Sequence, residues 1–227
     1  MKVTIRSYNT FYFFLLCCFM LAGCATVKPS ALNQNLQSVD ISKESIVILS
    51  VKVSNQYKPS YQPKIAYVFV WETDKENGKK FSFKVDGEYR EIKNECNEYL
   101  ISFQLPPGRY KLRELFAQSG IFPIIGTFSI PIYSVFEIGA NEIIYLGHIE
   151  AYLVERTNDS DLRAGPVIPL IDQAVAGASG GTFVIKISDL YEDDMGLFRK
   201  QYPCLSNCNI KDMALPSWEK PSEADMQ

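Results

Sequence analysis

Histidine is the side chain that acts most often in general acid–base catalysis, and this chain has one. His148 lies in an apolar stretch between Gly147 and Ile149. A zinc site takes several His, Cys or carboxylate ligands, so one histidine cannot build it alone. We therefore predict a hydrogen-bonded strand residue at His148 and no metal site, with a pH-sensing role as the alternative.

Residues 177–181 (GASGG) match the G-x-S-x-G pattern that surrounds the nucleophile of many hydrolases. That nucleophile elbow needs a strand before its serine and a helix after it. Here a strand pattern follows Ser179, and His148 precedes the serine by only 31 residues. The segment therefore predicts a flexible glycine-rich entry to a strand. We assign no catalytic residue.

Three cysteines, Cys96, Cys204 and Cys208, lie in the body of the chain. Three residues separate Cys204 from Cys208, so a disulfide between them closes a short loop at low entropic cost. Such a bond is stable in an oxidising compartment. We predict this disulfide, while pairing of either cysteine with Cys96 stays open. A redox-active pair would more often be spaced C-x-x-C.

An acidic cluster comprises Asp189, Glu192, Asp193 and Asp194. It does not match the calcium-binding EF-hand loop, because Gly196 comes too late in the pattern. Carboxylates in the first turn of a helix are stabilised by the helix dipole. The cluster therefore predicts a helix start, with Asp189 and Glu192 spaced as a capping pair. A loose calcium site is the alternative.

The elements that position these residues begin with an N-terminal leader. Lys2 and Arg6 precede an apolar run from Phe11 to Gly23, which has 13 residues. A membrane-spanning helix needs about 20 residues, whereas this length is typical of the core of a signal peptide behind a basic start. We predict that residues 1–23 are a signal peptide.

Leu21-Ala22-Gly23-Cys24 resembles the lipobox of bacterial lipoprotein precursors. In that family the cysteine is acylated and the peptide before it is removed. The resemblance implies that Cys24 carries the lipid and begins the mature chain, whereas the preceding residues of Cys17 and Cys18 do not fit the motif. Where an aspartate after the cysteine would imply retention in the inner membrane, Ala25 implies the outer membrane, with the domain facing the periplasm.

The lipid anchor has consequences for partners. Buried acyl chains would hold the protein on the membrane. Removal of residues 1–23 takes away Lys2 and Arg6 and no acidic residue, so the net charge changes from −3 to −5. This acidic balance argues against nucleic acid and against anionic lipid headgroups as partners. Residues 24–43 are polar and rich in Asn, Gln and Ser, which predicts a lipidated tether.

Residues 44–188 show apolar residues at every second position, the pattern of half-buried strands. Turn signals such as Asn77-Gly78 separate the runs. The clearest runs span residues 47–53, 65–70, 81–85, 99–105, 109–115, 127–138, 142–154 and 183–187. Seven or eight short strands predict a mainly β domain built as an antiparallel β-sandwich.

The segment Leu105–Tyr110 (LPPGRY) predicts a type II turn, with Gly108 supplying the positive φ. Strand patterns enter it through Phe103 and leave it through Leu112. A hairpin of this kind resembles the prealbumin-like sandwiches of bacterial lipoprotein families that have no established chemistry. The resemblance covers residues 45–155 and implies a prealbumin-like or Ig-like fold.

Residues 189–227 predict a single helix, a cysteine loop and a tail. Leu190, Leu197 and Phe198 share one helical face, and Pro203 ends the run. Two further prolines and several acidic residues follow it, which is typical of a loosely held tail.

The sequence as a whole predicts a non-enzymatic outer-membrane lipoprotein that binds an envelope protein or glycan, or supports the envelope, and needs no cofactor. The alternatives are an envelope hydrolase and a carbohydrate-binding module. A pocket in which His148 or Ser179 meets a carboxylate would favour the hydrolase. A shallow groove floored by exposed tyrosines or Trp71 would favour the carbohydrate-binding module. Tyr57 and Tyr61 could stack on a sugar ring, or cover a sandwich edge.

Overall fold

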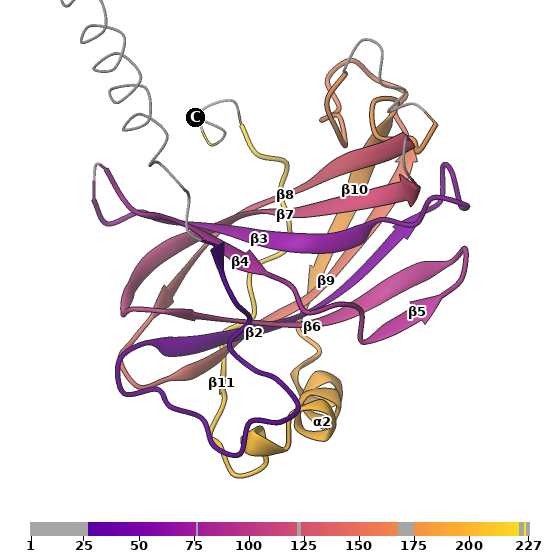
Figure 1. The fold of residues 1–227 in the computed structure, drawn as a ribbon. Helices are drawn as coiled ribbons and strands as arrows, with labels where there is room; N and C mark the ends of the chain where they lie inside the picture. Colours follow the sequence, from indigo (N-terminus) through magenta and orange to yellow (C-terminus); the bar gives the residue numbers. More distant parts are fainter. Residues whose placement is uncertain (1–26, 76, 122–123, 168–174, 223–224, 226–227) are drawn as a thin grey trace, which may run out of the picture.

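A computed structural model describes residues 27–75, 77–121, 124–167, 175–222 and 225. Two β-sheets pack face to face, and one helix lies against the outer face of one of them (Figure 1). The elements are β1 (Val27–Lys28), β2 (Ser45–Asn55), β3 (Lys64–Glu72), β4 (Lys80–Lys84), β5 (Arg90–Ile92), β6 (Cys96–Leu105), β7 (Gly108–Ile121), β8 (Ile124–Ile138), β9 (Ile143–Glu155), β10 (Gly181–Ser188), α2 (Tyr191–Gln201), the 3₁₀ helix η1 (Pro203–Leu205) and β11 (Lys211–Asp212).

The strands form two mixed sheets. Sheet A has the order β1-β4-β3-β7-β8, and sheet B has the order β10-β9-β2-β6-β5 with β11 added beside β9. The prediction of a mainly β sandwich is confirmed, but the prediction that it is antiparallel is wrong. β1 pairs with β4, β2 with β9, and β11 with β9 in parallel. A two-residue period shows which face of a strand is buried, and it is the same for both directions of pairing.

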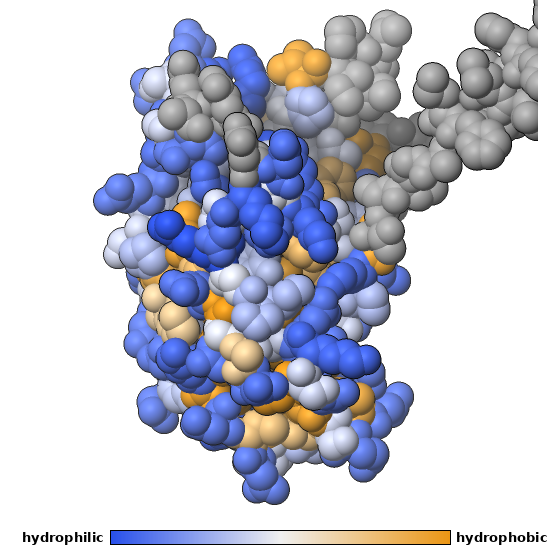
Figure 2. Space-filling model, turned by 90° about the vertical axis from the view of Figure 1, so that its left-hand side faces the viewer, coloured by the Kyte–Doolittle hydropathy of each residue, from blue (hydrophilic) through white to orange (hydrophobic). Residues whose placement is uncertain are grey.

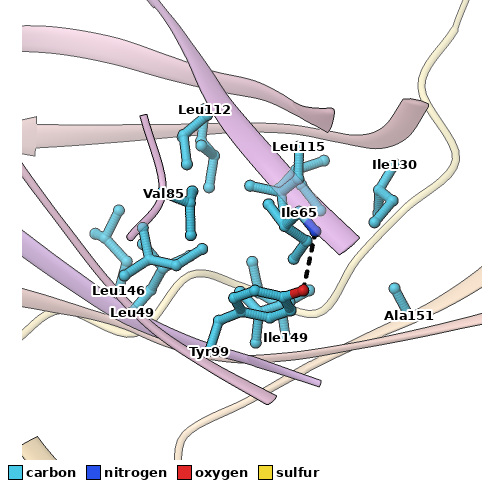
Figure 3. Close-up of a cluster of buried hydrophobic side chains, with 14 of the residues drawn as sticks. Leu49, Ile65, Val85, Tyr99, Leu112, Leu115, Ile130, Leu146, Ile149 and Ala151 are labelled. Carbon is cyan, nitrogen blue, oxygen red and sulfur yellow. Dashed lines mark hydrogen bonds between the residues drawn. The ribbon is translucent and has the colours of Figure 1, made fainter. Parts of the chain in front are cut away.

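The main core fills the space between the two sheets. Its side chains come from the alternating positions of the predicted strands, and Figure 3 shows part of it. Tyr99 from sheet B reaches across the core, where its hydroxyl accepts a hydrogen bond of 3.0 Å from the backbone N–H of Ile65 in sheet A. Main-core residues include Leu49, Val85, Leu112, Leu115, Ile130, Leu146, Ile149 and Ala151.

A second core lies on the outer face of sheet B. There α2 and η1 cover Ile46, Ile48 and Tyr145, with Phe198 and Leu205 contributed by the two helical elements. The prediction of one C-terminal helix agrees with the described residues. Within these residues, no helix is both long and apolar enough to cross a membrane.

The segment predicted as a tether, 24–43, is folded in its described part, and this corrects the sequence prediction. Val27 and Lys28 form β1, and Leu32 is fully buried in the second core. The backbone N–H of Leu32 donates a 2.9 Å hydrogen bond to Ser102 Oγ on β6. The composition of this segment is polar, but Leu32 and four further apolar residues pack in the second core: Ala31, Leu36, Val39 and Ile41. Only residues 25 and 26 lie between the predicted anchor, Cys24, and the first described strand.

The LPPGRY segment also differs from its prediction. β6 ends at Leu105 in sheet B and β7 starts at Gly108 in sheet A, so the turn crosses between sheets and does not close a hairpin. Gly108 is not among the glycines with positive φ. Glycine fits there because a Cβ would approach the Tyr110 hydroxyl at 3.3 Å. That hydroxyl donates a 2.8 Å hydrogen bond to the Pro106 carbonyl and so stabilises the turn between the two sheets.

The C-terminal segment runs along the side of the sandwich after β11 (Figure 1). Leu215 is buried in the main core, and the indole N–H of Trp218 donates a 2.8 Å hydrogen bond to the Pro131 carbonyl on β8. This stretch is therefore packed and does not form the loose tail that the sequence predicts. Hydrophobic side chains on the molecular face in Figure 2 are interspersed among hydrophilic ones.

Candidate functional site

The described residues bring one serine, one histidine and one aspartate together on the outer face of sheet B. Ser50 lies on β2, His148 on β9 and Asp194 on α2. The Ser50 hydroxyl donates a hydrogen bond to Asp194 Oδ2, and its Oγ lies 2.7 Å from His148 Nδ1. The Tyr145 hydroxyl donates to the same Asp194 oxygen. His148 is thus a hydrogen-bonded strand residue, as the sequence predicts.

A β-bulge in β9 allows both Tyr145 and His148 to reach this cluster. The register with β2 shifts between Ile48 and Ser50, and Gly147 has a φ of +103°. Residues three apart in a regular strand point to opposite faces, but an inserted residue restores a common face. The glycine inside a strand pattern was the sequence signal for this bulge.

The order in which the serine, histidine and aspartate are hydrogen-bonded determines the chemistry of this cluster. In a catalytic triad the histidine lies between the acid and the nucleophile. Here the serine lies between the acid and the histidine, with His148 Nδ1 3.8 Å from Asp194 Oδ2. A serine that donates to the carboxylate accepts from the Nδ1–H of the imidazole. Ser50 and Asp194 are only 4% and 3% exposed, so this hydroxyl is enclosed by its partners.

The cluster therefore acts as a polar clamp between α2 and sheet B. Its carboxylate accepts hydrogen bonds from hydroxyl groups on two adjacent strands, β2 and β9, which pair in parallel on either side of the bulge. Burial, and then the hydrogen bond to Asp194, raise the pKa of Tyr145 and keep it a neutral donor. We call Ser50, Tyr145, His148 and Asp194 the Asp194 clamp.

Ser179 does not join this cluster. The described part of GASGG is a turn that leads into β10, which agrees with the predicted entry to a strand. Gly181 pairs with Glu155, whereas His148 pairs with Ser188 at the other end of β10. Seven residues of strand, about 23 Å, therefore separate the two positions. The ring of Tyr57 packs against this turn, beside Gly177 and Gly180, and so covers a sandwich edge.

The cysteines with predicted roles lie in different environments. Cys96 is buried in β6, and burial raises the pKa of its thiol. Cys204 and Cys208 are half-buried free thiols around η1, and Cys208 Sγ donates to the Cys204 carbonyl at 3.3 Å. The disulfide between them stays a prediction. Cys24, the predicted lipid attachment site, lies outside the described residues, as do Cys17, Cys18 and Ala25.

One residue of the acidic cluster at α2 belongs to the Asp194 clamp, and the others lie at the surface. Asp194 is buried, whereas Glu192 and Asp193 are exposed in the first turn. The prediction that Asp189 caps the helix start holds in part: the N-cap position is Leu190, whose side chain makes no capping bond, but the Asp189 carboxylate accepts from the first N–H of α2. This hydrogen bond, from the Tyr191 N–H, is 3.0 Å long. No group of three potential metal ligands comes together among the described residues.

A shallow groove lies where β3 begins and β7 ends. It consists of two adjoining cavities of about 440 and 480 Å³ that share Gln62, Lys64, Ser119 and Gly120. Tyr61 lines one cavity and Tyr67 the other. We call this the Tyr61–Tyr67 groove.

Two glutamates hold the central lysine of this groove in place. Lys64 Nζ lies 3.0 Å from Glu88 and 3.1 Å from Glu91. The hydrogen bond to Glu88 raises the lysine pKa. The groove therefore combines two aromatic rings with fixed charges and an amide, which are the groups that bind hydroxyl-rich ligands.

Comparison with known proteins adds no family to this description. No protein family, curated protein or solved structure matches the chain. The functional argument therefore starts from the residues of the chain itself.

Proposed function

We propose that this protein is a lipid-anchored, non-enzymatic binding module of the bacterial cell envelope, held in the outer membrane and facing the periplasm. The observation that carries the proposal is the lipobox-like Leu21–Cys24 behind a signal-peptide pattern, followed after residues 25 and 26 by the first strand of a folded domain. Acyl chains on Cys24 would retain the domain at the bilayer without a membrane-spanning helix. The proposal includes no cofactor.

Metabolic labelling with a fatty-acid analogue tests the anchor. We expect label on the wild-type protein and none on Cys24→Ser, because the thiol carries the lipid. Cys18→Ser is the matched control and should keep the label, since Cys18 belongs to the part that is removed. Equal labelling of the wild type and Cys24→Ser would contradict the proposal.

The proposed periplasmic location also predicts the redox state of Cys204 and Cys208. In the periplasm we expect Cys204 and Cys208 to form a disulfide, since Cys204 lies in η1 and the Cys208 thiol already reaches the Cys204 carbonyl. Alkylation of unreduced protein, followed by mass spectrometry, should modify Cys96 alone after denaturation. Alkylation of all three thiols would contradict the disulfide.

For the fold, we propose a relation to prealbumin-like or Ig-like sandwiches. The support is the crossing turn at 105–110, where the Tyr110 hydroxyl bonds back to Pro106, as tyrosines do at the corners of such sandwiches. The parallel pairing of β2 with β9 departs from the antiparallel sheets of the Ig fold.

A carbohydrate-binding module is the second candidate function, and the Tyr61–Tyr67 groove favours it. Its two tyrosines and the fixed Lys64 suit a glycan chain laid across the end of the sandwich. Co-sedimentation with purified peptidoglycan tests this role. Tyr67→Ala should reduce the bound fraction, whereas Tyr57→Ala, which alters a tyrosine outside the groove, should not. Equal binding by both variants and the wild type would contradict it.

The hydrolase alternative has less support, because the Asp194 clamp encloses its serine and Ser179 lies far from His148.

A further inference from the structure

The outer face of sheet A carries a row of side chains that crosses four strands. Lys80 on β4 pairs with Trp71 on β3, Trp71 pairs with Lys111 on β7, and Lys111 pairs with Val135 on β8. Residues beside them in sequence, such as Val70, belong to the main core, so these four side chains point away from it. With Arg113 and Tyr133, we call this set the Trp71 row.

Cations and aromatic rings are interleaved in the Trp71 row. Lys80 Nζ lies 4.3 Å and Arg113 Cζ 4.2 Å from the centre of the Trp71 ring. Arg113 also lies 5.8 Å from the Tyr133 ring. Its Nε is buried and has no hydrogen-bond partner in the described part of the chain. Val135, at the end of the row, is 40% exposed.

The predicted anchor lies close to this row. Cys24 is three residues before Val27, a distance of at most about 11 Å. Val27 pairs with Ser82 on β4, which is two residues, about 7 Å, from Lys80. Because β1 and β4 are parallel, the chain enters β1 from the end of the sheet where Lys80 lies (Figure 1). Val27 itself is 46% exposed.

Carboxylates leave part of the positive charge of the row unpaired. Lys111 Nζ is 3.9 Å from Asp225, and Arg113 Nη1 is 3.4 Å from Glu114. Lys80 has no ion pair with a described residue. The acidic first turn of α2 lies on the opposite side of the sandwich, against sheet B (Figure 1). The outer face of sheet A is therefore locally positive, although the predicted mature chain has a net charge of −5.

We propose that the Trp71 row is a membrane-contact face that binds the phosphate headgroups of the bilayer carrying the Cys24 anchor, an inference that rests on the proposed lipidation. Tryptophan and tyrosine favour the depth of the headgroups, and lysine and arginine beside them bind lipid phosphate. The exposed valines contact the upper acyl region. The short linker then sets the orientation of the domain, with sheet A toward the membrane and α2 away from it.

The chain has two tryptophans, which makes the face measurable. The mature lipidated protein is reconstituted into phosphatidylethanolamine–phosphatidylglycerol vesicles with and without bromine on the acyl chains near the headgroup. Trp218→Phe leaves only Trp71, and Trp71→Phe leaves only Trp218, the reporter whose indole bonds to the Pro131 carbonyl on the edge strand β8. We expect bromine to reduce Trp71 emission at least about twofold more than Trp218 emission. Equal quenching of the two would overturn the proposal.

A pair of charge variants in the otherwise unchanged chain gives an independent readout. Lys80→Glu should lower the quenching by brominated lipid, because it places an acid among the headgroups. Lys186→Glu, on the outer face of sheet B, should leave it unchanged. Equal quenching in both variants would count against the headgroup contact.

The mass of the N-terminal peptide separates this inference from the proposed function. A chain without acyl groups on Cys24 would refute the anchor, and the face with it. An acylated chain whose Trp71 is not preferentially quenched would refute the face alone.

Discussion

At the residue scale, one buried carboxylate holds three elements together. Asp194 on α2 accepts hydrogen bonds from Ser50 on β2 and Tyr145 on β9. A buried acceptor that loses its partners, or buried donors that lose their acceptor, cost the desolvation of those groups. The clamp therefore couples the position of α2 to the strand register below it.

Replacing Asp194 should weaken the folded state. We expect Asp194→Ala to lower the free energy of unfolding by about 2 kcal/mol, because the buried hydroxyls of Ser50 and Tyr145 lose their acceptor. Urea denaturation of the mature chain measures the change. Asp193→Ala, one residue earlier but exposed, should change the value by less than about 0.5 kcal/mol. A similar loss in both variants would show that the clamp contributes nothing beyond the local helix charge.

At the element scale, the bulge in β9 decides which residues share a face. Ile144 and Leu146 point into the main core, and Ile149 does so again beyond Gly147. The change of phase at the glycine places Tyr145 and His148 on the same outer face, below α2. A regular strand with this sequence would bury one of them in the main core.

The same substitution should have opposite effects at two glycines. Gly147→Ala should destabilise the protein by about 1–3 kcal/mol, because φ is +103° and the new Cβ would meet the Ser188 carbonyl at 3.1 Å. Gly196→Ala should stabilise it by about 0.5–1 kcal/mol, since this glycine lies within α2 with nothing near its Cβ position. Thermal unfolding of the two variants compares them. Stabilisation by Gly147→Ala would contradict the bulge.

At the scale of the whole molecule, tyrosines tie both cores to the backbone, and this makes stability depend on alkaline pH. Burial raises the pKa of Tyr110, Tyr152 and Tyr202 to about 12, and it also raises the pKa of Tyr99 and Tyr145. In the unfolded chain a tyrosine titrates near pH 10. The folded chain therefore holds more protons than the unfolded chain between about pH 10 and 12.

The expected result is a loss of stability with rising pH. The contribution of these tyrosines is fully present below about pH 10 and decreases as the pH rises toward 12, because the unfolded state releases protons that the native state retains. Free energies of unfolding measured in denaturant at several pH values above 9 check the sign. Tyr110→Phe should make the dependence shallower. A stability independent of pH over this window would contradict the assignment.

Local patterns alone determined several features of this protein. The two-residue period identified the buried faces, for example Val47, Leu49 and Val51 of β2, because each side chain position depends only on its own strand. The predicted leader and the lipobox-like pattern likewise rest on local sequence alone, and they stay predictions. Of the candidate site, His148 could be assigned as a hydrogen-bonded strand residue, but Ser50 and Tyr145 could not be found.

Only the tertiary structure decided how these strands combine. The alternation of residues is identical for parallel and antiparallel partners, so the pairing of β2 with β9 was not predictable from it. The polar composition of residues 27–43 did not reveal that Leu32 packs beneath sheet B. The Asp194 clamp and the Trp71 row each join residues from at least three elements. Such contacts form only when the strands have paired and the helix has packed on the sheet.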